Sequence, residues 1–550
     1  MNNEFDLIKE GKLCVERSLY QRAEELFKQA IALNSGNSEA YAELGKVYYI
    51  QGHFPDCRTH LEKAIQIDGE NTCAYFLFAK AYKEEGRFPE ALQGFKKAVE
   101  LNTRQGIVPL ETITEQCHRE LSALYYRQRD FSAAAEELRK ARMCGCPQET
   151  YQEQLQQLYR GQIRVLGELN FTGEYEKASD ESVRAEEFIG PESPMFYNMV
   201  RNEADISSKK IELGGNVRAL TVTLTNKCNL ACIMCKTHYK PWDLPVKCIE
   251  EIVGLFPYLE RVMWQGGEVF LYEGFREMLK EAARFPMRQI IATNGILINR
   301  ELAEILVKSN VELTFSIDGA TKEVYEHIRQ GARFEQVLAS VEWINQMRET
   351  YNPTMQTRLN VLVMRSNYHQ IEGFLDFAKK YRFTTVFFNS TGEDFQNARE
   401  NVFCYARDDE VVRYLDTIRN KVACKAKEYG IRLENWLPTP GFLDKAQAET
   451  HSSQISSQEK EAVPQEKKNI LLCHAPWQRM YVDCGGTVRP DCLCPTDRPI
   501  GSITENTFAQ LWNGEKMKEY RSKILSNQAE GFCNPDCVFG RVAPVNLKFV

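Results

Sequence analysis

Three cysteines stand close together near the middle of the chain, at Cys228, Cys232 and Cys235, in a C-x3-C-x2-C arrangement. Three thiolates at this spacing can ligate three irons of a cubane cluster and leave the fourth iron open to another ligand. A zinc knuckle or buried thiols are the alternatives, but structural zinc sites use four ligands and no second cysteine pair lies nearby in the sequence. The spacing therefore predicts an open iron–sulfur cluster.

The sequence around this loop alternates between short β-branched runs and helical patterns. The runs lie near 219–225, 261–265, 289–293, 312–317, 358–364 and 384–389. Six β–α units predict a parallel sheet with helices outside, which at this length curls into a full or partial barrel. In such sheets the chemistry lies at the carboxyl ends of the strands, so we expect functional residues there.

Short motifs follow successive predicted strands in chain order. After the loop from Thr225 to Cys235 come Gly266-Gly267-Glu268, Thr293-Asn294-Gly295, Ser316-Ile317-Asp318-Gly319 and Tyr325 to Arg329. In this order the motifs resemble the radical SAM superfamily, in which S-adenosylmethionine (SAM) chelates the open iron. The resemblance implies one-electron reduction of a 4Fe-4S cluster, with Cys228, Cys232 and Cys235 as catalytic and metal-binding residues. Reductive cleavage of SAM would then release a 5'-deoxyadenosyl radical that abstracts hydrogen from a substrate.

Charge and shape suggest how the other motif residues contact SAM. Gly266 and Gly267 let the backbone approach a ligand closely, and Glu268 or nearby carbonyls can accept from its ammonium group. Thr293 and Asn294 are further candidates, although both could simply form a turn. Met234 stands where the family commonly has an aromatic residue beside the adenine.

Three residues after the fourth predicted strand complete the expected SAM site. Ser316 can donate to a carboxylate or ribose oxygen, Asp318 can accept from ribose hydroxyls, and Arg329 suits the methionine carboxylate. The structural alternatives are a helix cap for Ser316 or Asp318 and a surface ion pair for Arg329.

A second group of six cysteines falls within 65 residues, at Cys473, Cys484, Cys492, Cys494, Cys533 and Cys537. This region resembles the SPASM/twitch extension of radical SAM enzymes, in which a β-hairpin and a helix hold an auxiliary 4Fe-4S cluster. The resemblance implies one cluster on Cys473, Cys492, Cys533 and Cys537, with Cys494 or Cys484 as a substitute. Asp491 occupies a place where the family often has a cysteine. Zinc is the alternative metal, because four thiolates satisfy it equally well.

The first third of the chain repeats with a period of 34 residues. The positions in register are Gly11, Gly45 and Ala79; Ala23, Cys57 and Ala91; Phe27, Leu61 and Phe95; and Ala30, Ala64 and Ala98. Small residues at fixed places let antiparallel helices approach closely. The pattern resembles the tetratricopeptide repeat. A fourth copy follows an insertion at 106–114, with Leu121, Tyr125, Ala134, Leu138 and Ala141 in the equivalent places. Such solenoids usually hold an extended peptide or another protein in a groove, and self-association or a rigid spacer is the alternative.

Length and composition limit the other possibilities. The chain has 550 residues, 43% of them apolar and 26% charged, and no apolar stretch approaches the ~18 residues of a membrane span. The net charge of −7 gives no general attraction for nucleic acid. No secretory signal is visible, so we expect a cytoplasmic protein with reduced cysteines.

These observations predict a multidomain chain. We expect an all-α repeat domain at 1–190, a linker at 191–215, an α/β partial (β/α)6 radical SAM barrel at 216–440, a flexible linker at 441–470, and a small α+β SPASM/twitch-like domain at 471–550.

The preferred hypothesis is a radical SAM oxidoreductase or modifying enzyme that acts on a peptide or protein presented by the repeats. A flavodoxin or ferredoxin would supply electrons. The alternatives are a radical SAM dehydrogenase acting on an alcohol or sugar, or a zinc-binding adaptor without catalysis.

Overall fold

The computed structural model describes residues 3–105, 111–235, 240–309, 311–389, 400, 409–435, 473–528 and 532–533. The chain divides into two compact units, Met1–Val165 and Leu166–Val550. The expected linker at 441–470 and most of the insertion at 106–114 lie outside the described residues. None of the described helices is long and apolar enough to cross a membrane.

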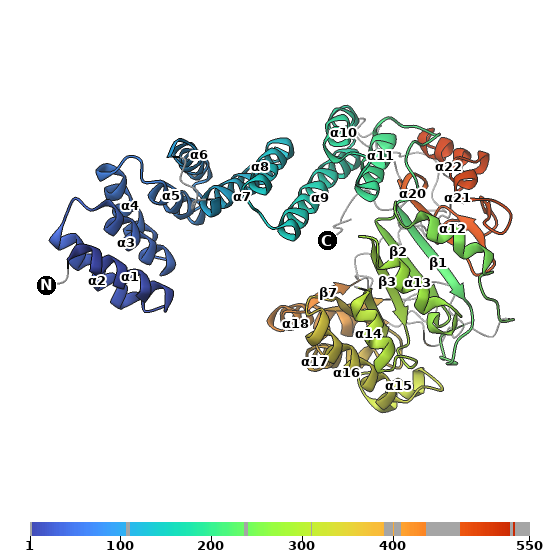
Figure 1. The fold of residues 1–550 in the computed structure, drawn as a ribbon. Helices are drawn as coiled ribbons and strands as arrows, with labels where there is room; N and C mark the ends of the chain where they lie inside the picture. The colour runs from blue at the N-terminus through green and yellow to red at the C-terminus, as the bar shows by residue number, and fades with distance from the viewer. Residues whose placement is uncertain are drawn as a thin grey trace, which may run out of the picture. The chain divides into compact units, whose positions relative to one another are not determined.

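The first unit consists of paired antiparallel helices (Figure 1). They are α1 (Glu4–Glu16), α2 (Tyr20–Leu33), α3 (Ser38–Ile50), α4 (Phe54–Ile67), α5 (Thr72–Glu84), α6 (Phe88–Gln105), α7 (Glu111–Arg127), α8 (Phe131–Met143) and the start of α9 (Gln148–Thr172). Three of the helices begin at asparagine caps that share the 34-residue period: Asn3, Asn37 and Asn71 each accept from a backbone N–H of the first turn.

The repeat positions form the core of this unit, as expected. Phe27, Leu61 and Phe95 are fully buried. A Cβ at Gly11 would lie 2.5 Å from the ring of Phe27, and one at Gly45 would lie 2.7 Å from Leu61. These glycines are therefore needed for close helix packing. Of the fourth-copy positions, Leu121, Ala134, Leu138 and Ala141 are buried too, and Tyr125 is half-buried against the core.

The second unit contains a helix where a linker was expected. Helix α10 (Tyr175–Ile189) packs on α11 (Pro194–Ser207), which lies within the predicted linker 191–215. The structure differs here because α11 buries polar as well as apolar side chains. Asn198 donates to the carbonyls of Val217 and Tyr258, and Asn202 donates to that of Asn216. Buried polar residues of this kind hide the apolar period of a helix from sequence analysis.

Parallel strands form the centre of the second unit. The six predicted strands are β1 (Ala219–Thr225), β2 (Arg261–Gly266), β3 (Arg288–Thr293), β4 (Val311–Ser316), β5 (Thr357–Leu362) and β6 (Thr385–Asn389). They lie in sequential order and are followed by an unpredicted seventh strand, β7 (Arg432–Asn435). The predicted partial α/β barrel is confirmed, and its strands extend beyond the six that the sequence indicated.

Helices connect these strands and cover one face of the sheet (Figure 1). They are α12 (Lys247–Leu255), α13 (Phe275–Ala282), α14 (Arg300–Lys308), α15 (Lys322–Ile328), α16 (Phe334–Tyr351), α17 (Ile371–Lys380) and α18 (Asp409–Glu428), with short turns η2 (Val269–Leu271) and η3 (Tyr368–Gln370). Because side chains alternate along a strand, Val222, Trp264 and Phe315 are fully buried beneath the helices, whereas Thr223 and Gln265 lie on the other face.

The C-terminal segment continues the same sheet. Strand β8 (Arg479–Val482) pairs with β1 in parallel, and β9 (Thr487–Arg489) and β10 (Gly501–Ser502) follow in antiparallel order. Three helices pack beside them: α20 (Ala475–Gln478), α21 (Phe508–Trp512) and α22 (Glu515–Leu525). The predicted small α+β domain is thus joined to the barrel by backbone hydrogen bonds.

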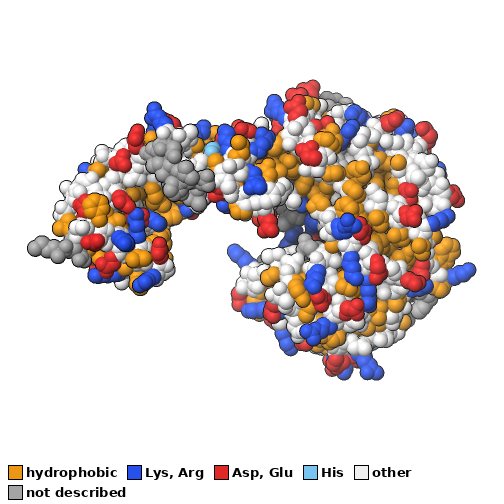
Figure 2. Space-filling view, in the orientation of Figure 1, with side chains coloured by type: hydrophobic (Ala, Val, Ile, Leu, Met, Phe, Trp, Pro, Cys, Tyr) orange, Lys and Arg blue, Asp and Glu red, His pale blue; other side chains and the backbone are white. Residues whose placement is uncertain are grey.

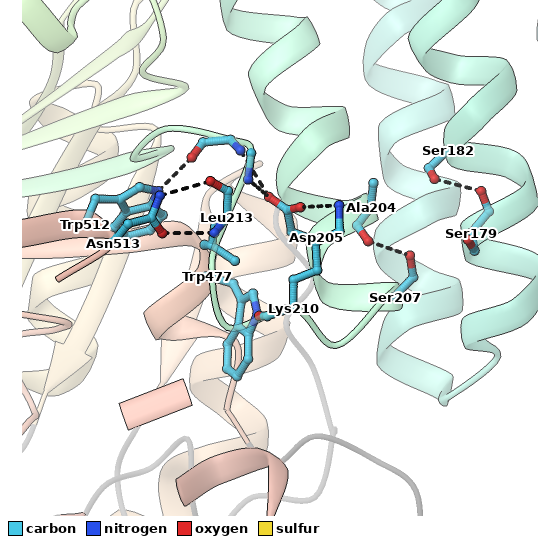
Figure 3. A network of polar contacts seen from close by, with 12 residues as sticks. Ser179, Ser182, Ala204, Asp205, Ser207, Lys210, Leu213, Trp477, Trp512 and Asn513 are labelled. Carbon is cyan, nitrogen blue, oxygen red and sulfur yellow. Dashed lines mark hydrogen bonds and ion pairs between the residues drawn. The ribbon is translucent and has the colours of Figure 1, made fainter. Parts of the chain in front are cut away.

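The loop from α11 to β1 fixes this C-terminal segment in place (Figure 3). The indole nitrogens of Trp477 and Trp512 donate to the carbonyls of Lys210 (2.8 Å) and Gly215 (2.7 Å). Asn513 exchanges two hydrogen bonds with the backbone of Leu213. Because each bond satisfies a backbone group, the loop docks with a defined register.

Candidate functional site

The cysteine loop is held against the carboxyl end of β1 from two sides. On one side the backbone N–H of Gly267 donates to Thr225 (2.8 Å) and that of Glu268 donates to Lys227 (2.8 Å). On the other side the N–H groups of Ala231 and Ile233 donate to carbonyls at the end of α15, at 2.9 and 3.0 Å. The loop therefore lies where parallel α/β sheets carry their chemistry, as predicted.

The three thiols of this loop lie within one electrostatic environment. Cys228, Cys232 and Cys235 are partly exposed. Cys228 and Cys235 lie close enough to Cys232 for their negative charges to raise its pKa slightly, in addition to the larger effect of burial. Burial raises the pKa of Cys232 to about 11, against the opposing effect of the Arg329 guanidinium. Arg329 Nη1 lies 3.9 Å from Cys232 Sγ. A cysteine binds iron as a thiolate, after its thiol has lost the proton. The nearby cation therefore suits a metal-ligating cysteine.

Gly266 and Gly267 have a packing role in this structure. A Cβ at Gly266 would lie 2.5 Å from the carbonyl oxygen of Thr225, and one at Gly267 would collide with the carbonyl oxygen of Lys227. The sequence suggested that these glycines leave room for a ligand. The structure shows that they leave room for the backbone of the cysteine loop, and Gly266 also remains exposed to solvent.

The buried side chain of Glu268 links the end of β2 to the turn after β3. Its carboxylate accepts from the Thr293 hydroxyl (2.8 Å) and from the Asn294 backbone N–H (2.9 Å), and it is 1% exposed. Burial raises the pKa of Glu268 against the effect of these donors. The expected contact with the SAM ammonium group is therefore not open to this side chain. Asn294 instead reaches the loop, with Nδ2 2.8 Å from Asn229 Oδ1 and 3.9 Å from Cys228 Sγ.

Asp318 also differs from its expected role. It is completely buried, and its carboxylate accepts from Arg329 Nε (2.8 Å) and from the Leu362 backbone N–H (2.7 Å). A side chain without accessible surface cannot receive ribose hydroxyls, so the expected ribose contact is not available. Asp318 instead holds Arg329 beside Cys232. Ser316 is half-buried and remains reachable from the open face of the sheet.

Two asparagines in the site were not singled out from the sequence. Asn229 lies inside the cysteine loop and is bonded to Asn294. Asn367 is fully buried after β5, donates to the carbonyls of Asp318 (2.9 Å) and Leu362 (2.8 Å), and fixes the turn that carries Asp318. The position of Asn367 shortly after a strand is the only sequence signal for it. Met234 packs in a small apolar cluster with Ile233, Val324, Leu362, Ile328 and Met364.

The C-terminal cysteines separate into different surroundings. Burial raises the pKa of the Tyr520 hydroxyl, and the nearby thiols of Cys494 and Cys533 raise it further. Cys473 and Cys494 pack against the core of the second unit. Cys492 is exposed and its thiol donates to Asp491, while Cys484 lies in the β8–β9 turn near Asp243. Cys494, which the sequence offered as a substitute ligand, and Cys533 thus both lie near Tyr520, whereas the expected ligand Cys492 is exposed. Cys537 lies outside the described residues.

Comparison with protein families agrees with this geometry. Residues 222–378 match the radical SAM superfamily, and residues 473–538 match the SPASM iron–sulfur cluster-binding domain. The chain contains a radical SAM domain followed by a SPASM domain. Residues 38–71 and 74–104 match tetratricopeptide repeats, a kind of repeat that binds proteins or peptides. The radical SAM and SPASM domains use SAM and 4Fe-4S clusters. Cys228, Cys232 and Cys235 are partly exposed on one loop, but within the described ranges no three His, Cys, Asp or Glu side chains are gathered closely enough to hold a metal ion.

Curated relatives share the radical SAM region. The chain is 26% identical over 183 residues to a GTP 3',8-cyclase of Chlorobaculum tepidum (32% of this chain, 54% of the relative). It is 29% identical over 168 residues to the mycofactocin maturase MftC of Mycobacterium ulcerans (30% and 44%). It is 23% identical over 304 residues to the antilisterial bacteriocin subtilosin biosynthesis protein AlbA of Bacillus subtilis (53% and 59%). The chain spans about half the length of these relatives.

Among solved structures, Streptococcus suis SuiB bound to the precursor peptide SuiA aligns with a TM-score of 0.42 and 17% sequence identity. The alignment covers 60% of this chain and 71% of SuiB.

Proposed function

We propose that this protein is a radical SAM enzyme that modifies a peptide or protein presented by its repeats. The observation that carries the proposal is the loop of Cys228, Cys232 and Cys235 at the carboxyl end of β1, with Arg329 3.9 Å from Cys232 Sγ. When bound there, a 4Fe-4S cluster and SAM would supply a 5'-deoxyadenosyl radical for hydrogen abstraction. The protein's own residues would hold and orient these groups.

The proposed work of these residues is positioning. Arg329, held by the buried Asp318, provides a fixed cation beside Cys232. Glu268 fixes the turn at Thr293 and Asn294, and this turn supports the loop from below. Ser316 and the exposed backbone at Gly266 are the candidates for direct SAM contact, because both remain accessible. A rigid arrangement of this kind aligns the reacting groups before the chemical step.

The repeats and two of the relatives support a peptide or protein substrate. Tetratricopeptide solenoids present a groove suited to extended chains. The similar proteins include one named as a maturase and one named for bacteriocin biosynthesis. A second candidate is a small-molecule substrate, which the similarity to GTP 3',8-cyclase favours.

The test is substrate-dependent formation of 5'-deoxyadenosine by the anaerobic holoenzyme, with dithionite as reductant. We expect stimulation by a peptide substrate and none by alcohols, sugars or nucleotides. Cys228→Ala, Cys232→Ala and Cys235→Ala should each abolish formation, because the cluster would lose a ligand. Wild-type rates in any of these variants would contradict the site, and stimulation by a metabolite alone would contradict the substrate class.

We further propose that Cys473, Cys494 and Cys533 ligate the SPASM cluster, with Cys537 as a fourth ligand. The supporting observation is the common position of Cys494 and Cys533 beside Tyr520, whereas Cys492 is exposed beside Asp491. Cys494→Ser should lower the iron and sulfide content by about one cluster per chain, because Fe–S clusters depend on their thiolate ligands. Cys492→Ser is the matched control and should keep the wild-type content. The reverse pattern would restore the expectation drawn from the sequence.

A further inference from the structure

Three polar side chains are hydrogen-bonded to one another on the face of the sheet opposite the covering helices. The hydroxyl oxygens of Thr223 and Tyr481 lie 3.0 Å apart, and Gln265 Nε2 donates to Thr223 Oγ1 (3.1 Å). These residues belong to β1, β8 and β2, so the contact joins the SPASM segment to the centre of the barrel. We call Thr223, Gln265 and Tyr481 the Thr223 network.

The Thr223 network lies beside the cysteine loop, in a part of the sheet with small side chains. Gln265 is the register partner of Thr223 and directly precedes Gly266. Ala292 and Thr314, which are paired on the next two strands, lie on the same face of the sheet. Barrel interiors are usually filled by valine, isoleucine and leucine, so these smaller side chains leave space for a ligand.

One hydroxyl proton of the network has no acceptor. The amide nitrogen of Gln265 can only donate, so Thr223 Oγ1 is the acceptor in that bond. Thr223 and Tyr481 have two hydroxyl protons between them, and the bond that joins them uses one. Neither hydroxyl has a further partner among the described residues, so the second proton is available to a ligand.

The network also offers an acceptor beside this donor. Gln265 Oε1 accepts from no donor within the described ranges and keeps access to solvent, and the side chains of Gln265 and Thr223 are only half-buried. A hydroxyl donor beside a carbonyl acceptor is complementary to a peptide group, which has one C=O acceptor and one N–H donor.

Arg489 fixes the ring of Tyr481. The two residues are register partners on β8 and β9, and the Arg489 guanidinium lies 4.7 Å from the centre of the ring. Arg489 Nη1 also donates to the carbonyl of Cys494 (2.8 Å). A hydroxyl on a ring held in this way needs little further ordering when a ligand binds, which favours affinity.

We propose that the Thr223 network binds a backbone peptide group of the substrate. The available hydroxyl proton donates to the peptide carbonyl, and Gln265 Oε1 accepts from the peptide N–H. The inference rests on the proposed function, because a peptide substrate is part of it. A peptide group held here fixes the substrate chain beside the cysteine loop, which orients the neighbouring residue of the substrate for hydrogen abstraction.

The test measures binding of a short probe to the anaerobic holoenzyme. The probe is N-acetylalanine methylamide, and its dissociation constant is measured by NMR titration. Thr223→Val and Tyr481→Phe together remove both hydroxyl protons with side chains of similar shape, so the fold should be kept. This double variant should raise the dissociation constant about three- to tenfold, as the loss of one hydrogen bond does, and should bind SAM like the wild type.

A second probe tests the acceptor. It is the ester analogue of the first, in which oxygen replaces both N–H groups. The wild type should bind the amide more tightly than the ester, because only the amide has an N–H for Gln265 Oε1. Gln265→Met should remove this preference, since the methionine side chain has no carbonyl oxygen.

Tyr429→Phe is the matched control. The Tyr429 hydroxyl also donates to a side chain, Asp376 Oδ1 at 2.9 Å, but this bond lies among the outer helices. Those helices expose charged side chains of both signs (Figure 2). The variant should bind both probes like the wild type.

Three outcomes would overturn the site: no binding of the amide to the wild type, wild-type affinity for the amide in the double variant, or a loss of SAM affinity in the double variant. The last would assign the hydroxyls to SAM instead of the substrate. Failure of the wild-type enzyme to cleave SAM with dithionite would overturn the proposed function and would leave the probe measurements standing.

Discussion

At the scale of single residues, the site relies on buried carboxylates that support other groups. Asp318 and Glu268 have almost no exposed surface, and each accepts from donors within the protein. A buried carboxylate that lacked such donors would be strongly destabilising. Their role is therefore to fix Arg329 and the Thr293–Asn294 turn beside the cysteine loop.

Asp318→Asn should destabilise the second unit by ~3–5 kcal/mol, because it leaves the Arg329 guanidinium buried without its counter-charge. The measurement is the free energy of unfolding from urea titration of the purified protein. Glu335→Gln is the control, since the pair of Glu335 and Lys322 is exposed and its loss should change stability little. Equal effects of the two substitutions would contradict the supporting role of Asp318.

At the scale of elements, the ends of β1 and β2 must approach one another closely to hold the cysteine loop. Gly267 makes this possible because any side chain there would collide with the backbone of Lys227. The sequence indicated the importance of this glycine through its position after a strand. Its actual neighbour became known only when the two strand ends were placed side by side.

Gly267→Ala should displace the cysteine loop and lower both stability and iron content, with a loss on the order of 1–3 kcal/mol typical of overpacking. The measurements are urea unfolding and iron analysis after anaerobic purification. Gly254→Ala in α12 is the matched control, because no heavy atom lies within 4 Å of the added Cβ. It should leave iron content unchanged and stabilise the helix by ~0.5–1 kcal/mol. Normal iron content in Gly267→Ala would contradict the packing argument.

At the scale of the whole molecule, the second unit holds both cysteine sets on one continuous sheet. Strand β8 of the SPASM segment pairs with β1, the strand that leads into the cysteine loop. Arg521 is completely buried and donates to the carbonyls of Pro476, Ile211 and Trp512, which ties α20, α22 and the loop after α11 together. Ligand binding at one cysteine set should therefore stabilise a region that includes the other.

Removal of iron by chelation under reducing conditions should lower hydrogen-exchange protection around Cys228 and Cys473 and along β1 and β8. The reason is that a group bound only to the folded state contributes its binding free energy to stability. Mass spectrometry of exchanged peptides measures this region by region. Helices α3 and α5 of the first unit supply the internal control and should keep their protection. A uniform loss across both units would contradict the division of the chain.

The order of the amino acids was enough to predict the features that depend on neighbours along the chain. The C-x3-C-x2-C loop, the 34-residue repeat and the alternation of strand and helix are local patterns, and all were found at their predicted places. Tertiary structure decided which partners the polar residues meet. Examples that join residues distant in sequence are the burial of Asp318 against Arg329, the positions of Cys494 and Cys533 near Tyr520, the packing of the helix within 191–215 and the pairing of β8 with β1. Such contacts depend on how the strands and helices pack, which the period of a single segment does not contain.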